Sequence, residues 1–163
     1  METERSGCTR IRFTKPDKDG NVQIEDNVMS IMYAEEQAGY LAGYAAVTEG
    51  YKNLGFMGGI AVPAVIRYGY GFIQGADAAA KDMGLKAGDI KMKYTYVGNF
   101  DASPENNAKA AAWYNEGTEC IFACGGGVGN SVMKAAETAD KVVIGVDAVS
   151  YTHLRAHETP EHL

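Results

Sequence analysis

Residues 120–130 read CIFACGGGVGN, an apolar run of five residues that leads directly into a glycine-rich loop. A strand without any polar position is typical of a parallel sheet whose two faces are both covered by helices. The run at residues 141–147, KVVIGVD, is the next predicted strand, and a helix near residues 130–137 is expected between the two. This strand–helix–strand pattern predicts an α/β fold.

The same alternation begins upstream, where residues 54–60, LGFMGGI, and residues 90–97 are predicted strands. Ser103 is a favourable N-cap and Pro104 a favourable first helical residue, so a helix is expected between them and Gly117. The sequence therefore predicts a parallel sheet of four strands with helices on both faces.

Two further helices are expected from the spacing of apolar residues. The helix after Pro63, which would end at Gly84, carries one apolar stripe formed by Ile66, Tyr70, Ile73, Ala76 and Ala80. An earlier helix that begins near Glu35 carries an apolar face formed by Ala34, Ala38, Leu41 and Ala45. In this earlier helix Gly39 and Gly43 lie four residues apart, which predicts a close approach of its backbone to a neighbouring helix or sheet.

The two ends of the chain do not continue this pattern. Residues 13–27 are polar and predict a loop, and residues 28–33 predict a short strand. Residues 148–163 contain all three histidines and resemble the translated sequencing-adapter runs that occur at the ends of unrelated reading frames. We therefore expect a non-native tail over these residues and no metal site among its histidines.

Composition restricts the classes of function. The chain has 163 residues, of which 46% are hydrophobic, and a formal net charge of -6. The length suits one domain, and no stretch approaches the ~18 apolar residues of a membrane span. An acidic chain has no surplus of positive charge for phosphates, so nucleic acid is not an expected partner. Cys8, Cys120 and Cys124 are too few for a disulfide framework, and we expect Cys120 and Cys124 to be buried thiols on one strand face.

Ligands of parallel α/β sheets bind beyond the carboxyl ends of the strands. Four such ends are expected here, at residues 58–63, 98–101, 125–130 and at Asp147. The glycines of residues 125–129 could bring backbone N–H groups against a ligand, or they could simply form a tight turn. The loop lacks the last glycine of a dinucleotide fingerprint, because Asn130 takes that place, and it lacks the lysine of a phosphate-binding loop.

Two side chains at these ends are candidate ligand contacts. Asp147 could accept hydrogen bonds from a vicinal diol such as that of ribose, or it could be the N-cap of a following helix. Phe100 lies in a polar turn and could stack on a flat ligand, or it could cover the sheet edge. The patterned region contains no histidine, so a histidine-based catalytic triad is not expected. No metal and no cofactor is expected either.

Five motifs taken together resemble the basic-membrane-protein (PnrA-like) family. They are EEQAGYLAG at 35–43, LGFMGGI at 54–60 followed by Val62 and Pro63, YVGNFD at 96–101, ACGGGVG at 123–129 and IGVD at 144–147. The resemblance covers about residues 12–147 in the right order. Members of this family are substrate-binding proteins of ABC importers, and the better understood ones are purine nucleoside receptors.

The resemblance implies a type I periplasmic-binding-protein fold, in which two α/β lobes close on the ligand. Residues 1–50 would form the end of the first lobe, residues 51–147 part of the second lobe, and residues 148–163 the non-native tail. It also implies that this chain is a truncated fragment of a lipoprotein that lies outside the cell membrane, with the signal and lipid anchor missing.

The resemblance further implies roles for individual residues. Phe100 would stack on the purine and Asp147 would take the ribose hydroxyls. Gly125, Gly126 and Gly127 would line the ribose pocket, and Ile60 and Tyr68 are further candidate ligand-binding residues.

We therefore expect the substrate-binding component of an ABC importer, which binds a purine nucleoside or a similar neutral small molecule, passes it to the permease and performs no chemistry. Two alternatives are the ligand-sensing domain of a cytoplasmic transcriptional regulator with the same fold, and a small doubly wound enzyme that binds a nucleotide. For the fragment itself we expect weak or absent affinity, because only one side of the cleft would be present.

Overall fold

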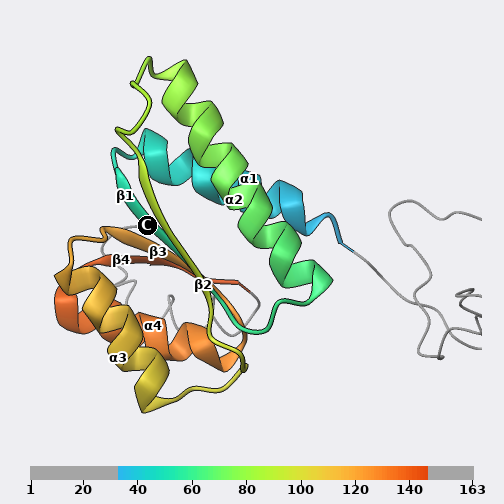
Figure 1. The fold of residues 1–163 in the computed structure, drawn as a ribbon, viewed down its shortest axis with the longest axis vertical. Coiled ribbons are helices and arrows are strands. Elements are labelled where there is room, and N and C mark those ends of the chain that lie inside the picture. Colours follow the sequence, from blue (N-terminus) through green and yellow to red (C-terminus); the bar gives the residue numbers. More distant parts are fainter. Residues whose placement is uncertain (1–32, 147–163) are drawn as a thin grey trace, which may run out of the picture. The chain divides into compact units, whose positions relative to one another are not determined.

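The structure is a computed structural model, and it describes residues 33–146. Helices and strands alternate along the described residues, as the sequence predicts (Figure 1). In chain order they are α1 (Glu35–Thr48), β1 (Asn53–Gly58), α2 (Pro63–Asp82), β2 (Lys91–Tyr96), α3 (Pro104–Asn115), β3 (Cys120–Cys124), α4 (Gly127–Ala139) and β4 (Val142–Ile144).

The strands form one parallel sheet with the order β2-β1-β3-β4. Helices α1 and α2 cover one face of this sheet, and α3 and α4 cover the other (Figure 1). Parallel neighbours must be joined by crossovers, and each connection between the strands contains one of the helices α2 to α4. The predicted fold class, a parallel sheet with helices on both faces, is confirmed.

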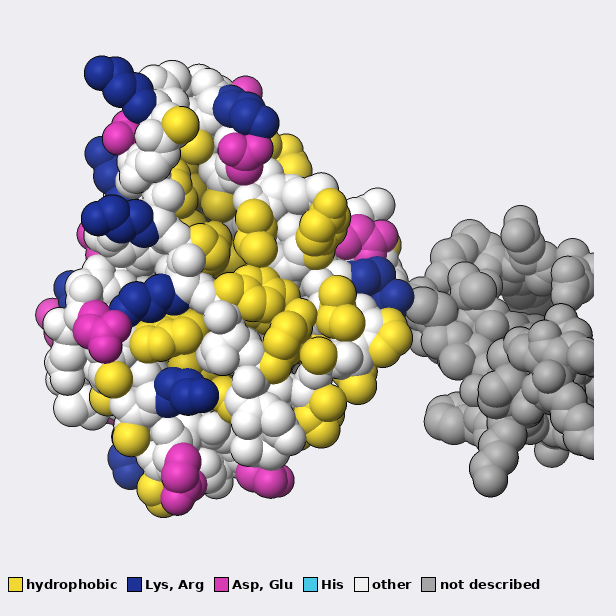
Figure 2. All heavy atoms as spheres, viewed as in Figure 1, with side chains coloured by type: hydrophobic (Ala, Val, Ile, Leu, Met, Phe, Trp, Pro, Cys, Tyr) yellow, Lys and Arg dark blue, Asp and Glu magenta, His cyan; other side chains and the backbone are white. Residues whose placement is uncertain are grey.

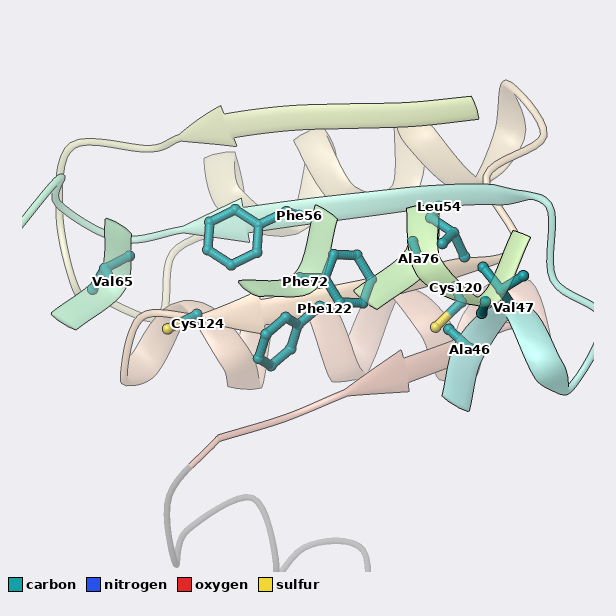
Figure 3. Close-up of a cluster of buried hydrophobic side chains, with 11 residues drawn as sticks. Ala46, Val47, Leu54, Phe56, Val65, Phe72, Ala76, Cys120, Phe122 and Cys124 are labelled. Carbon is teal, nitrogen blue, oxygen red and sulfur yellow. The ribbon is translucent and has the colours of Figure 1, made fainter. Parts of the chain in front are cut away.

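The core lies on both sides of the two central strands. On the α1–α2 side, the rings of Phe56, Phe72 and Phe122 pack together at centroid distances of 5.1–5.6 Å and are at most 1% exposed (Figure 3). Each fully buried ring contributes roughly 1.5–3 kcal/mol. Cys120 and Cys124 lie in the same cluster as free buried thiols, which confirms their prediction; burial raises the pKa of the Cys120 thiol to about 12.

Glycines hold α1 and α2 in direct backbone contact. A Cβ added at Gly39 would overlap the carbonyl oxygen of Tyr68, and one added at Gly43 would overlap that of Phe72. The relation is reciprocal, because a Cβ at Gly71 or Gly75 would overlap a carbonyl oxygen of α1. The predicted close approach at Gly39 and Gly43 is therefore confirmed, and the neighbour is a helix.

The predicted apolar face of α1 is wrong, and that of α2 is wrong in part, since Ala76 of the predicted stripe is buried and Ala80 is half-buried. Ile66, Tyr70 and Ile73 are 40–61% exposed, and hydrophobic side chains gather along α2 on this side of the molecule (Figure 2). The residues of α2 that are buried are Val65, Gly69, Gly71, Phe72, Gly75, Ala76 and Ala79. On α1, the predicted face of Ala38, Leu41 and Ala45 is likewise exposed. Periodicity follows large apolar side chains, whereas the side that meets the other helix is made of glycines.

Helix α1 lies in one compact unit with the sheet, a unit that begins at Glu35. The structure thus groups α1 with the residues that follow it, whereas the sequence analysis assigned residues 1–50 to a first lobe. The predicted loop at 13–27, the strand residues 28–32 and the tail at 148–163 lie outside the described residues, so the lobe assignment stays a prediction.

The carboxylate of Glu119 joins the start of β3 to the start of β1. Its Oε2 accepts hydrogen bonds from the backbone N–H groups of Lys52 at 2.9 Å and Asn53 at 2.8 Å. These bonds favour the charged form and lower the pKa of the Glu119 carboxyl below its ordinary value of 4.5.

Lowering the pH should selectively remove the contribution of Glu119 to stability. Because folding lowers its pKa, the charged carboxylate stabilises the folded chain above about pH 4.5, and the contribution is lost as the pH falls through the lowered pKa. We expect the difference in free energy of unfolding between the wild type and Glu119→Gln, measured with urea, to be largest above pH 5 and to shrink towards pH 3. A difference independent of pH would contradict this role.

Substituting Gly43 should destabilise the chain although alanine is the better helix former. The intrinsic gain is about 1 kcal/mol. In Gly43→Ala, however, the new Cβ meets backbone atoms of α2, which cannot rotate away, so a cost of about 3 kcal/mol is expected. Urea unfolding should therefore show a net loss of about 2 kcal/mol. Gln37→Ala, at an exposed position of α1, is the matched control and should not destabilise; equal stability of the two variants would refute the contact.

Candidate functional site

The carboxyl ends of β1, β2 and β3 lie at one level of the sheet. Gly58, the last residue of β1, is in register with the last residues of both neighbours, Tyr96 and Cys124. Hydrogen bonds continue beyond the strands, since the Gly59 N–H donates to the Cys124 carbonyl at 2.9 Å and the Gly98 N–H donates to the Gly59 carbonyl at 3.0 Å. The three loops that follow these strands are therefore side by side.

Phe100 packs its ring on the bare backbone of Gly59. A Cβ at Gly59 would overlap the Cδ1 and Cε1 atoms of the ring and would lie 2.8 Å from the Asn99 carbonyl oxygen. Glycine at residue 59 is thus what allows the ring to lie there. Phe100 nevertheless remains 40% exposed, so part of this aromatic residue is open to solvent at the edge where ligands of such sheets bind.

Two of the glycines after β3 pack against the loops that follow β1 and β2. A Cβ at Gly125 would lie 2.6 Å from the Gly59 nitrogen, and a Cβ at Gly127 would lie 2.6 Å from the Ala102 nitrogen. Close packing therefore explains both residues. Gly126 is exposed and has a φ of +53°, a backbone conformation that favours glycine. The N–H of Gly127 donates to the Phe100 carbonyl at 2.9 Å, which ties the glycine loop to the aromatic residue.

The buried side-chain amide of Asn106 is hydrogen-bonded to the Phe100 loop. The Nδ2 group of Asn106, a residue only 4% exposed, donates to the Asn99 Oδ1 at 3.0 Å and to the Asp101 carbonyl at 2.9 Å. The Asn99 Oδ1 also accepts the Asp101 N–H at 3.0 Å. Asn106 was not predicted from the sequence, because its position three residues after the N-cap Ser103 indicates only the capping bond of its backbone N–H.

The start of α3 is joined to α4 by a second set of hydrogen bonds. The Ser103 N–H donates to the Ser131 Oγ at 3.0 Å, and this hydroxyl donates to the Ser103 carbonyl at 3.2 Å. Asn107 Nδ2 donates to the Ser131 carbonyl at 3.0 Å. As predicted, Ser103 is the N-cap, because its Oγ accepts the Asn106 N–H at 3.2 Å. Ser131 was not foreseen from the sequence.

The remaining predicted site residues differ in their placement. Ile60 follows Gly59 directly and is 41% exposed, so it belongs to the same edge. Tyr68 is half-buried and packs its ring against Phe122 at a centroid distance of 6.0 Å, which is the environment of a core residue. Asp147 lies outside the described residues. The structure thus brings Phe100, the glycine loop and Ile60 together at one edge, and it places the Tyr68 ring against Phe122 of β3.

One arginine of α2 forms ion pairs with two glutamates at the start of α1. Arg67 Nε lies 2.7 Å from the Glu35 Oε2 and 3.6 Å from the Glu36 Oε2. The hydrogen bond to Glu35 raises the pKa of the Arg67 guanidinium.

Within residues 33–146, no three His, Cys, Asp or Glu residues are close enough to hold a metal ion. An open aromatic residue beside bare backbone suits a flat, neutral ligand better than a strongly charged one.

A separate hollow of about 350 Å³ lies between the C-terminal half of α2 and the start of β2. Its apolar lining includes Ile73, Ala76, Leu85, Ile90 and Met92. It is at the opposite end of β2 from Phe100 and has no part in the arrangement at the carboxyl edge. None of the helices described is long and apolar enough to span a bilayer.

A family model and the curated relatives agree on one family of proteins. The model of a family described as "ABC transporter substrate-binding protein PnrA-like" matches residues 16–154. The ABC transporter nucleoside-binding protein BmpA of Lactococcus lactis is 34% identical in an alignment of 138 residues that covers 79% of this chain and 37% of that protein. Basic membrane protein D of Borreliella burgdorferi is 32% identical in an alignment of 129 residues that covers 77% of this chain and 36% of that protein.

A solved structure shows the same arrangement. The solute-binding protein of an ABC transporter system from Conexibacter woesei is 26% identical and superposes with a TM-score of 0.62, over 76% of this chain and 39% of that one. The chain thus spans little more than a third of the length of these proteins.

The contact between Phe100 and Gly59 can be tested without any ligand. We expect nuclear Overhauser effects between the Phe100 ring protons and the Gly59 Hα in the wild type, and their loss in Gly59→Ala, because the new methyl group takes the place of the ring. Ala61→Ser, at an exposed position two residues away, should leave them unchanged. Persistence of these effects in Gly59→Ala would show that the ring does not occupy this place.

Proposed function

We propose that this chain, which belongs to the PnrA-like family of ABC transporter substrate-binding proteins, carries one side of a binding site for a purine nucleoside or a similar neutral small molecule. The main support for this proposal is the half-exposed ring of Phe100, which packs on Gly59 beside Gly126 at the carboxyl edge of the sheet. In this role Phe100 stacks on the base, and the exposed backbone of the glycine loop lies along the sugar.

The ligand class follows from the chemistry of this edge together with one relative. Stacking of a base on an aromatic ring contributes about 1–3 kcal/mol and requires no charge. The Lactococcus relative is named as a nucleoside-binding protein, and 34% identity extends over 138 residues that include the Phe100 loop and the glycine loop. Asp147, after β4, is the proposed acceptor for the ribose hydroxyls, and Ile60 is the proposed apolar neighbour of the base.

The proposed protein binds its ligand without changing it. It acts outside the cell membrane, as a lipid-anchored protein, and delivers the ligand to an ABC permease. Tyr68 of α2, a half-buried residue whose ring packs against Phe122, is a further proposed ligand contact. Since the chain spans 37% of the length of its Lactococcus relative, the residues present supply part of the contacts, and the affinity of the chain is expected to be weak.

Nuclear magnetic resonance detects weak binding and reports where it occurs. In a titration of the ¹⁵N-labelled chain with guanosine, adenosine or inosine, we expect saturable shifts in the amide signals of Gly59, Phe100, Gly126 and Gly127. Phe100→Leu keeps an apolar side chain but removes the ring, so affinity should fall at least fivefold, in line with the ~1–3 kcal/mol of stacking. Tyr70→Ala, which removes a ring 61% exposed on α2, is the matched control and should bind like the wild type.

Two outcomes would count against the proposal. Signal shifts confined to the hollow beside Ile90 and Met92 would show that the ligand binds there and not at the carboxyl edge. Equal affinity of Phe100→Leu and the wild type would show that the ring does not stack on the ligand. A 5′-phosphate on the nucleoside is expected to weaken binding. Tighter binding of the nucleotide would instead favour a nucleotide-binding enzyme.

A further inference from the structure

We propose that Asn106 is a positioning residue, which holds the Phe100 loop in its binding conformation before a ligand arrives. The inference rests on the proposed function, because it concerns the ring that would stack on the ligand. Its physical basis is one buried side-chain amide that serves both polar groups of one loop residue, Asp101. That amide donates to the Asp101 carbonyl directly, and it reaches the Asp101 N–H through the shared acceptor Asn99 Oδ1.

Capping does not account for the burial of the Asn106 side chain. The helix start is capped by the Ser103 Oγ, which accepts the backbone N–H of Asn106 and makes no contact with the Asn106 side chain in that bond. Any residue except proline at position 106 would supply that N–H. A side chain in the first turn of a helix can point to solvent at no cost, and burying an amide is unfavourable unless it is hydrogen-bonded. Asn106 is 4% exposed, and its Nδ2 donates both of its hydrogen bonds to the loop.

These bonds act on the two peptide groups that follow the Phe100 ring. In the first, the Phe100 carbonyl accepts the Gly127 N–H and the Asp101 N–H donates to the Asn99 Oδ1; in the second, the Asp101 carbonyl accepts the Asn106 Nδ2. The ring therefore projects from a loop whose backbone is bonded to the glycine loop on one side and to α3 on the other. A loop that is ordered before binding does not have to be ordered by the ligand, and the affinity is higher by that amount.

Asn107 offers a matched control within the same helical turn. It is the same residue type, and its Nδ2 also donates to a backbone carbonyl, that of Ser131 at 3.0 Å. That bond joins α3 to α4 and involves no atom of residues 99–101. Loss of the Asn107 side chain thus removes a comparable hydrogen bond while leaving the Phe100 loop untouched.

The first measurement needs no ligand. Amide hydrogen exchange of the full chain should be at least tenfold faster at Asp101 in Asn106→Ala than in the wild type, with the Gly59 amide, which donates to Cys124, unchanged. In Asn107→Ala the exchange rate at Asp101 should equal that of the wild type. Equal exchange at Asp101 in Asn106→Ala and the wild type would overturn the inference, whatever the chain binds.

The second measurement couples the loop to the ligand. In the guanosine titration we expect affinity to fall at least threefold in Asn106→Ala and to be unchanged in Asn107→Ala. Should Asn106→Ala fail to fold, Asn99 provides the test: Asn99→Asp keeps an acceptor oxygen and should retain wild-type affinity, whereas Asn99→Ala should lose at least threefold. Equal affinities of Asn99→Ala and Asn99→Asp would overturn the inference. A wild-type chain that binds no nucleoside would refute the proposed function, while the exchange result at Asp101 would still decide the role of Asn106.

Discussion

The parallel pairing of β1 with β2 on one side and β3 on the other is the constraint on which the candidate site depends. This pairing places Gly58, Tyr96 and Cys124 at one level, so the loops after all three strands begin beside one another. Side chains alternate between the faces of a sheet, and a slip by one residue would exchange the buried and the outward sets. The two aromatic and aliphatic clusters on either face of the sheet therefore hold the register, and the register brings Gly59, Phe100 and the glycine loop together.

Absence of side chains matters in this protein as much as their presence. Between α1 and α2, glycines let two helix backbones touch, and at the carboxyl edge Gly59 and Gly125 let two loops touch. In both places the backbone of one segment occupies the space that a Cβ would need. The consequence at the helices is that Ile66, Tyr70 and Ile73 of α2 are exposed, and at the edge it is a half-open Phe100 ring.

Much of this could be predicted because it is encoded locally. The Ser103 cap, the apolar run at 120–124 and the glycines after α2 and α3 are local signals, and the corresponding elements begin or end within about three residues of the expected places. The family was also identified correctly, since the order of its motifs survives in the sequence. The rule that ligands bind at carboxyl strand ends indicated Phe100 as a candidate, and the structure places its ring at this edge. Asn106 was not, because nothing in its neighbourhood in the sequence indicates that its amide reaches back to Asn99 and Asp101.

Local pattern thus determines the kind, the order and the approximate limits of the helices and strands, because capping, turn formation and apolar spacing act over a few residues. Tertiary packing decides which side of α1 and of α2 is buried, where the Phe100 ring lies and which amide holds its loop. Those outcomes depend on how closely two distant segments approach each other. That distance is set by the side chains that are missing between them, and periodicity in one segment carries no record of its partner.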